Sequence, residues 1–343
     1  MRRAGGWVLG AIVVATMAGG GGLALKRVYS REIATVLYLR SDNTRGPTRD
    51  AIWRGAQYAL GEAMARAGRF RVRLEASDPG GVASPDVAVW IGTTEAIAKQ
   101  GKTQPTPFHV SALNTHPFDP TGHYGVIPDY PHQGRAAAQW SKSSKLQRIF
   151  LLRDVSSAYS EAISSAFLSA AGNELIVEGP VDPLIGREAL YRRILDFRPD
   201  LVFYAGEEAP YSTTREVFTA FREKGYVGKL STADADPEVS FLVAPGRLVE
   251  GVFLISPFAP APAEFDAGYA RLMGVRPGPH VTCGYFAMKA ALDLLDRADS
   301  LKPDDLQRAA AASPFFIRDS TTERPCALYV ARNGKFEFVQ ELK

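Results

Sequence analysis

Residues 146–180, LQRIFLLRDVSSAYSEAISSAFLSAAGNELIVEGP, contain one complete strand–helix–strand unit, around which the rest of the chain can be arranged. Residues 149–152 are an apolar run without alternation, which is typical of a strand buried on both faces of a parallel sheet. Ser156 or Ser157 can cap the helix that follows, and residues 175–177 form the next strand. Because two parallel strands joined by a helix need a right-handed crossover, this unit predicts a layered α/β domain.

Similar units recur in two series along the chain. The first series has predicted strands at 34–39, 70–74, 87–91, 108–112 and 123–127 and predicted helices at 52–63 and 95–100. The second series begins with a helix at 133–140, and it has predicted strands at 149–152, 175–177, 201–204, 230–232 and 252–255. A proline-rich crossing at 257–262, a helix at 282–298 and a hairpin whose strands are 327–330 and 336–339 complete the pattern.

Two successive α/β series followed by a return crossing predict an α/β chain of two Rossmann-like lobes, with parallel sheets and a hinge. We expect lobe 1 at residues 33–132 plus 257–315, and lobe 2 at residues 133–256 plus 316–343. Such a pair of lobes has a cleft that closes on a ligand by hinge motion. Ligands of open α/β sheets bind at the carboxyl ends of the strands, which is where Tyr159 follows its strand.

The charge of the chain is concentrated at its N-terminus. The 343 residues carry a net charge of +3, but Arg2, Arg3, Lys26 and Arg27 precede every acidic residue. Without these four, the 40 basic residues become 36 against 37 acidic ones, a net charge of −1. A near-neutral body offers no electrostatic footprint for nucleic acid, so we expect no nucleic-acid partner.

Residues 1–27 have the pattern of a signal peptide or a membrane anchor. Residues 4–25 are apolar or small and uncharged, and they follow two arginines. Thr16 and Ala18 could be the small residues of a cleavage site, whereas the full run is long enough to span a bilayer. We therefore expect a periplasmic or other extracytoplasmic location, with residues 4–25 either cleaved or retained as an inner-membrane anchor.

The sequence carries little that would support catalysis. The five histidines show no metal-ligand spacing, no Gly-x-Ser-x-Gly motif occurs, and no phosphate-binding loop follows a strand. Cys283 and Cys326 are the only cysteines, and we expect both to be free buried thiols. We expect a protein that is not an enzyme and that uses no metal or cofactor.

Several short motifs share the order and spacing of a known family. They are the Gly55–Ala56 helix after the first strand, the turn at 90–94, the loop at 110–115, the segments 154–159, 199–206 and 251–257, and the Gly284–Tyr285 helix. From about Ile33 to the C-terminus, the chain resembles the type I periplasmic binding proteins. Within them it is similar to the leucine/isoleucine/valine-binding family of amino-acid receptors for ABC transporters.

The resemblance implies a binding site for an amino acid. In that family, hydroxyls and backbone amides of the first lobe hold the ligand carboxylate, and an acid and aromatics of the second lobe complete the site. By position, Thr93 or Thr94 would supply the hydroxyl at a helix N-terminus, and Thr115 would supply the one in the following loop. Tyr159 matches the second-lobe tyrosine, and Asp234 aligns with the acid that pairs with the ligand ammonium.

Each of these residues also has an ordinary structural interpretation. Thr93 and Thr94 can simply cap a helix, Thr115 can be a turn residue, and Tyr159 can belong to a hydrophobic core. Asp234 can be a solvated loop acid.

The sequence also departs from the family at two positions. Thr48 stands near the place of an expected aromatic, and Glu207 replaces a tyrosine. The carboxylate of Glu207 would suit a cationic or polar ligand, or would point to solvent.

The resemblance implies a solute-binding protein that captures an amino acid or similar small polar ligand for an ABC transporter permease. The alternative is a ligand-sensing or regulatory module of the same fold, anchored in the membrane by residues 4–25.

The N-terminal pattern predicts export of everything after about Lys26. A reporter enzyme that works only outside the cytoplasm, fused after Lys343, should therefore be active in intact cells. The same fusion without residues 1–27 should be inactive and serves as the control. A full-length fusion that accumulates in the cells but is inactive would contradict export.

Overall fold

The computed structural model describes most of the chain after residue 31. It covers residues 32–40, 46–64, 70–78, 87–101, 108–113, 123–154, 157–172, 174–180, 187–205, 212–233, 250–315 and 325–342. The N-terminal segment 1–31 lies outside it, so the predicted signal or anchor at 4–25 is not described. No helix within these described ranges is long and apolar enough to cross a membrane.

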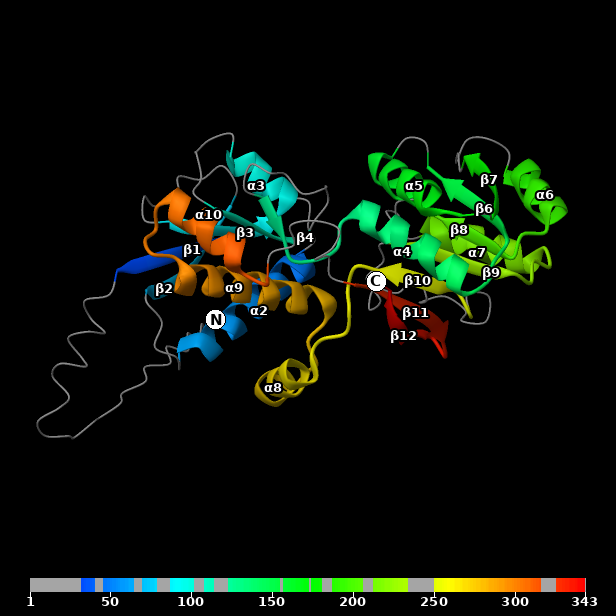
Figure 1. Cartoon of the computed structure of the whole chain (residues 1–343). Coiled ribbons are helices and arrows are strands. Elements are labelled where there is room, and N and C mark those ends of the chain that lie inside the picture. Colours follow the sequence, from blue (N-terminus) through cyan, green and yellow to red (C-terminus); the bar gives the residue numbers. More distant parts are fainter. Residues whose placement is uncertain are drawn as a thin grey trace, which may run out of the picture.

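The first lobe is a parallel sheet with helices on both faces (Figure 1). Its strand order is β2-β1-β3-β4-β5. The strands are β1 (Ile33–Leu39), β2 (Arg71–Ser77), β3 (Val87–Thr93), β4 (His109–Leu113) and β5 (His123–Gly125). The helices are α2 (Gly46–Met64), α3 (Thr94–Gly101), α8 (Ala263–Met273), α9 (Pro279–Arg297) and α10 (Pro303–Ala312). Alternate residues of β1 face the two sides: Val36 and Tyr38 pack in the core under α2 and α9, and Leu37 packs beside α3.

The second lobe repeats this plan and adds a hairpin. Its strand order is β12-β11-β10-β9-β8-β6-β7, in which only the β10–β11 and β11–β12 pairs are antiparallel. The strands are β6 (Arg148–Arg153), β7 (Leu175–Pro180), β8 (Leu201–Tyr204), β9 (Lys229–Ala233), β10 (Phe253–Ser256), β11 (Cys326–Arg332) and β12 (Lys335–Leu342). The helices are α4 (Tyr130–Ser143), α5 (Ala158–Ala170), α6 (Arg187–Phe197) and α7 (Ser212–Glu223).

The central strand β6 is buried on both faces, as its unbroken apolar run predicts. Ile149 and Leu151 pack in the core under α4 and α5, whereas Phe150 and Leu152 pack in the core under α6 and α7. All four are fully buried. The strand–helix–strand unit predicted from residues 146–180 is confirmed.

In both sheets, the side on which the next strand is added reverses after the second strand. In the first lobe β2 lies outside β1 and the chain then returns to β3, and in the second lobe β7 lies outside β6 and the chain returns to β8. The reversal places β1 beside β3 and β6 beside β8. At such a switch point the loops leave in opposite directions and open a crevice at the carboxyl ends of the strands.

In each lobe a glycine lets the helix after the first strand approach a second helix closely. A Cβ atom at Gly55 of α2 would lie 1.9 Å from the carbonyl oxygen of Val281, and one at Gly284 of α9 would lie 2.0 Å from that of Ile52. In the second lobe, a Cβ atom at Gly134 of α4 would lie 2.3 Å from the carbonyl oxygen of Ile163 in α5. Only glycine permits such contacts between backbones.

The crossing from β10 to α8 is attached to both lobes at Phe258. Its side chain belongs to the first-lobe core and lies 5.5 Å from the ring of His280 in α9, between ring centroids. Its carbonyl oxygen accepts a 2.7 Å hydrogen bond from the hydroxyl of Tyr329 in β11. Its N–H donates to the hydroxyl oxygen of Ser256, 3.1 Å away. The crossing is therefore a defined connection between the two lobes.

The structure confirms the predicted strands and differs mainly in two helices. The sequence analysis predicted neither α8, which begins directly after the proline-rich crossing, nor α10. Cys283 and Cys326 are free and buried, as predicted, and they lie in the cores of different lobes. The predicted hairpin forms with Asn333 and Gly334 at φ 51° and 76°, the two left-handed positions of a type I′ turn.

The close contact of α2 with α9 makes a prediction about stability. Gly284→Ala should lower the free energy of unfolding by about 2 kcal/mol, because the added methyl group meets backbone atoms that cannot move aside. Gly61→Ala is the matched control on α2, since a Cβ there meets nothing within 4 Å, and it should stabilise by about 0.5–1 kcal/mol. Urea unfolding measures both. Equal effects would contradict the contact.

Candidate functional site

Thr93 lies at the switch point of the first lobe, at the carboxyl end of β3. Thr93 is the last residue of β3, is 6% exposed, and is followed at once by α3. Its hydroxyl oxygen accepts a hydrogen bond from the N–H of Ala96, 3.2 Å away. Thr93 is therefore the N-cap of α3, and its own O–H hydrogen is not used in that bond. Thr94 is the first residue of α3, so both threonines lie at the N-terminus of this helix.

At the switch point of the second lobe, Asp154 directly follows the carboxyl end of β6. Ser157 caps α5, since its hydroxyl oxygen accepts from the N–H of Ser160 at 3.3 Å. The hydroxyl oxygen of Ser160 in turn accepts from the N–H of Asp154 at 2.9 Å. These bonds hold the turn from β6 into α5. Of the two predicted caps, Ser157 is the one used, and Ser156 lies outside the described residues.

Tyr159 lies in the first turn of α5 and is 6% exposed. Its ring packs edge-on against that of Tyr130, with centroids 4.6 Å apart and planes at 89°. Tyr130 is the first residue of α4, only three positions after Ile127 of the first-lobe core. Tyr159 is thus a core aromatic of the second lobe that also contacts the segment crossing between the lobes. Its structural interpretation is confirmed, and the contact with the crossing is a feature that the sequence did not suggest.

The remaining candidates, Thr115, Glu207 and Asp234, lie outside the described residues. The strands that lead to them are described. Thr115 comes two residues after the end of β4, Glu207 three residues after the end of β8, and Asp234 directly after the end of β9. β4 runs parallel to β3, β8 runs parallel to β6, and β9 runs parallel to β8. The loops that follow β4, β8 and β9 therefore leave from the same edge of their sheet as the switch point.

The start of α4 carries two titratable groups that the sequence did not suggest, the partly buried Asp129 and the buried His132. Asp129 caps the helix, with its Oδ1 accepting from the N–H of His132 at 2.8 Å. Burial raises the pKa of Asp129, against the opposing effects of that hydrogen bond and of Arg135. Burial lowers the pKa of His132 to about 4, and the positive charge of Arg135 adds to the shift. The sequence signal for this helix start was the aspartate followed two residues later by Pro131.

Neither a candidate metal centre nor either of the two cavities given below lies at these edges in the part of the chain that the structure describes. This part contains no group of three or more His, Cys, Asp or Glu side chains that could hold a metal ion. Two cavities of about 620 and 370 Å³ lie in the first lobe, and neither Thr93 nor Tyr159 lines them. The groups that lie at the carboxyl edges are hydroxyls, backbone amides and aromatic rings.

Comparisons with solved structures find the same architecture in known proteins. A leucine-binding protein from Thermotoga maritima is 19% identical, with a TM-score of 0.70 over 91% of this chain and 99% of that one. A putative branched-chain amino acid ABC transporter protein from Rhodospirillum rubrum is also 19% identical, with a TM-score of 0.73 over 90% and 100%. A solute-binding protein of an ABC transporter from R. palustris, in complex with benzoate, is 15% identical, with a TM-score of 0.64 over 91% and 96%.

No family model matches the chain, and no curated protein sequence matches it. The structural likeness nevertheless extends over nine-tenths of the chain and almost the whole of each similar structure. The chain therefore has the type I periplasmic-binding-protein fold, and the predicted fold class of two α/β lobes is confirmed.

The lowered pKa of His132 predicts how stability depends on pH. Between pH 6.5 and about 4 the unfolded chain binds a proton at this histidine that the folded chain does not. The free energy of unfolding should therefore fall by about 2 kcal/mol from pH 7 to pH 5 through this group alone.

His132→Gln should remove that part of the pH dependence, whatever it does to stability at pH 7. Urea unfolding of both proteins at pH 7 and pH 5 provides the test. The same pH dependence in the variant and in the unchanged protein would show that His132 is not the group responsible.

Proposed function

We propose that this chain is an extracytoplasmic solute-binding protein that captures a small polar ligand between its lobes for uptake by an ABC transporter. The supporting observation is the pair of switch points in strand order, one among the parallel strands of each lobe. Ligands of open α/β sheets bind at the carboxyl ends of the strands at such points. The similar solved structures support the same class of function, since they include solute-binding proteins of ABC transporters. A transporter permease is the partner, and the protein itself is not an enzyme.

We propose residues 33–132 plus 257–315 as the first lobe and 133–256 plus 316–343 as the second. Two separate sheets and separate cores support this division. Phe258 and the Tyr130–Tyr159 contact lie at or beside the crossings between the lobes. Motion about these crossings would bring the two carboxyl edges together on a ligand.

An amino acid or a close analogue suits the chemistry of these edges. A carboxylate that leaves water needs several hydrogen-bond donors, and the first amides of a helix such as α3 have no partner within the helix. The hydroxyl of Thr93 lies at this helix N-terminus, and Thr94 is proposed as a second hydroxyl donor. Thr115 is proposed as a further donor. The ammonium group needs an acceptor, a role proposed for Asp234. Tyr159 is proposed as the second-lobe aromatic of the same site, and Glu207 as the residue that selects a polar or cationic side chain.

The ligand class extends to other small carboxylates, because one similar structure is a complex with benzoate. The donors proposed at α3 serve any carboxylate, whereas Asp234 serves only a ligand with an ammonium group. A thermal-shift screen of amino acids, their amides and aryl carboxylates separates these cases. A ligand at a hundred times its dissociation constant adds about 2.7 kcal/mol of stability. A panel without any shift would count against the proposal.

A membrane-anchored ligand sensor of the same fold is the second candidate. The uncharged run at residues 4–25 favours it, because this run is long enough to span a bilayer. The mass of the exported protein distinguishes the two candidates. A soluble carrier would have lost the N-terminal segment, and a sensor would retain it.

Two truncations test the proposed site. Thr115→Ala should weaken binding of an amino acid about ten- to a hundredfold, because it removes a hydrogen bond to a charged group. Asp234→Ala should weaken an amino acid more than a carboxylate that lacks the ammonium group. Calorimetry measures both, and Asp304→Ala, an exposed acid at the start of α10, is the control. Unchanged affinity in both variants would mean that these residues do not form the site.

A further inference from the structure

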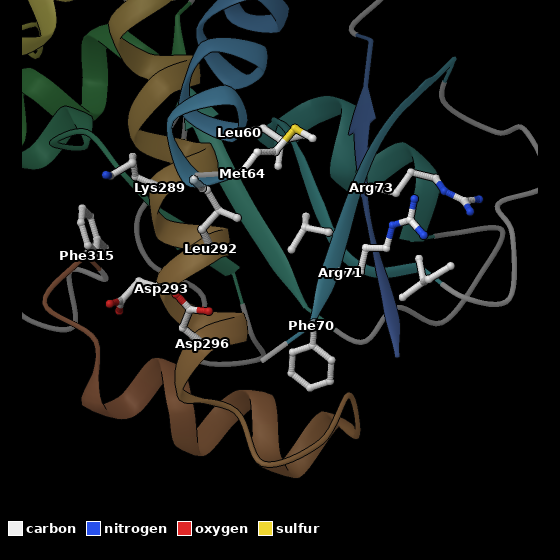
Figure 2. A pocket seen from close by; sticks show the side chains of 13 residues that line it. Leu60, Met64, Phe70, Arg71, Arg73, Lys289, Leu292, Asp293, Asp296 and Phe315 are labelled. Atoms are coloured by element: carbon white, nitrogen blue, oxygen red, sulfur yellow. The ribbon is translucent and has the colours of Figure 1, made fainter. Parts of the chain in front are cut away.

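Of the two cavities in the first lobe, only the smaller has a lining without acidic side chains. The larger, of about 620 Å³, carries charges of both signs, since Lys289 and Asp293 lie one turn apart on α9 (Figure 2). The smaller, of about 370 Å³, is lined by Arg54, Arg276 and His280 and by no described acid. Its volume is within the range of ligand sites, about 300–1,000 Å³. This lining favours an anionic occupant.

The smaller cavity lies where α8 packs on α2 and α9. The rings of Tyr58 in α2 and Tyr269 in α8 have centroids 5.3 Å apart, and Phe265 of α8 stacks on Tyr285 of α9 at 4.0 Å. The cavity is bounded by α2, by the C-terminal turn of α8, by the connection 274–278 and by the first turn of α9.

This cavity is separate from the helix end proposed for the transported ligand. Helix α3, which begins directly after Thr93, packs beside Leu37 on one face of the first-lobe sheet. Tyr269 and Val281, which line the cavity, belong to the core on the other face, under α2 and α9. An occupant of the cavity would therefore not contact α3.

Arg54 gives the cavity a positive charge that no neighbouring acid compensates. It is exposed on α2 and forms no ion pair with a described carboxylate. Arg276 differs, because its Nη1 lies 3.8 Å from Oδ2 of Asp266 in α8, which compensates its charge. The four acids of α2 and α8 do not line the cavity; they are Asp50, Glu62, Glu264 and Asp266. The net charge at the cavity is therefore that of Arg54.

The start of α9 contributes in the same direction. No side chain caps this helix at Gly278, and Pro279 is its first residue. Both residues line the cavity. The positive end of a helix dipole favours a nearby anion, so it adds to the effect of Arg54.

The remaining wall is apolar and open to water. Met273 is 44% exposed and Val275 is 63% exposed, and both line the cavity beside the buried Tyr269 and Val281. Removing exposed apolar surface from water is favourable. An occupant with an apolar body would therefore gain affinity from Met273 and Val275.

We propose that this cavity is a second ligand site, which binds a small organic carboxylate with its charged group at Arg54 and its apolar body against Met273 and Val275. A single uncompensated guanidinium matches a carboxylate in charge, and its planar fork matches the two carboxylate oxygens. The site does not depend on the proposed transport function, because none of the described residues proposed for the transported ligand lines it.

The test follows the methyl group of Met273 by NMR in the full-length protein labelled with [methyl-13C]methionine. Phenylacetate should shift this signal in a saturable way. The methyl signal of Met64, which lines the larger cavity, is the internal reference and should not shift. The amide 2-phenylacetamide has nearly the same shape without the charge, so it should bind about fivefold more weakly, as expected for a partly exposed ion pair.

Two substitutions separate the charge from the apolar wall. Arg54→Gln should weaken phenylacetate about fivefold and should remove the difference between the acid and the amide. Val275→Asp should weaken phenylacetate about tenfold or more, because the new carboxylate repels the anion and interrupts the apolar wall. Arg192→Gln and Val227→Asp make the same chemical changes at exposed positions of the second lobe and should leave binding unchanged. Unfolding midpoints confirm that every variant is folded.

The outcomes distinguish this site from the one between the lobes. Thr115→Ala should leave the response of Met273 to phenylacetate unchanged, whatever its effect on the transported ligand. Loss of the response in that variant would assign the shift to binding between the lobes and would overturn the proposal. A Met273 signal that does not respond, equal affinity for the acid and the amide, or equal losses in the controls would overturn it as well.

Discussion

The arrangement of both lobes depends on close contacts between helix backbones at three glycines. Gly55 and Gly284 let α2 lie directly against α9, and Gly134 does the same for α4 against α5. α2 and α5 are the helices that follow β1 and β6, so these contacts fix where the chain leaves each switch point. α4 begins where the chain first crosses from the first lobe to the second. α9 follows α8, which comes directly after the crossing from β10 back to the first lobe. The segments that join the lobes are thereby tied to the helices that border the proposed ligand edges.

Most of the fold could be predicted from the sequence because its strands are apolar runs with clear ends. Residues 149–152 required no tertiary information to be recognised as doubly buried. Helix α8 was missed because only Phe265 and Tyr269 of its residues are buried, which is too few for an apolar stripe to stand out after three prolines. Its place is fixed instead by contacts with Tyr58 of α2, which lies far away in sequence.

The candidate site could be predicted only in part. The place of Thr93 follows from local signals, since a strand ends and a helix begins there, and the structure shows that it caps α3. The burial of Tyr159 against Tyr130 depends on the crossing between the lobes, which no local pattern encodes. The roles of Thr115, Glu207 and Asp234 rest on the family resemblance and on the strands that lead to them. The two lobes contribute different chemistry, with helix-terminal amides and hydroxyls in the first and aromatic rings in the second.

The central claim is that the two carboxyl edges form one ligand site, and small-angle X-ray scattering tests it most directly. The radius of gyration would be measured for the full-length folded protein alone and saturated with each compound that raises its unfolding temperature. Closure of the lobes on a shared ligand predicts a smaller radius of gyration in the saturated protein. An unchanged radius with a compound that does bind would contradict a site shared between the lobes.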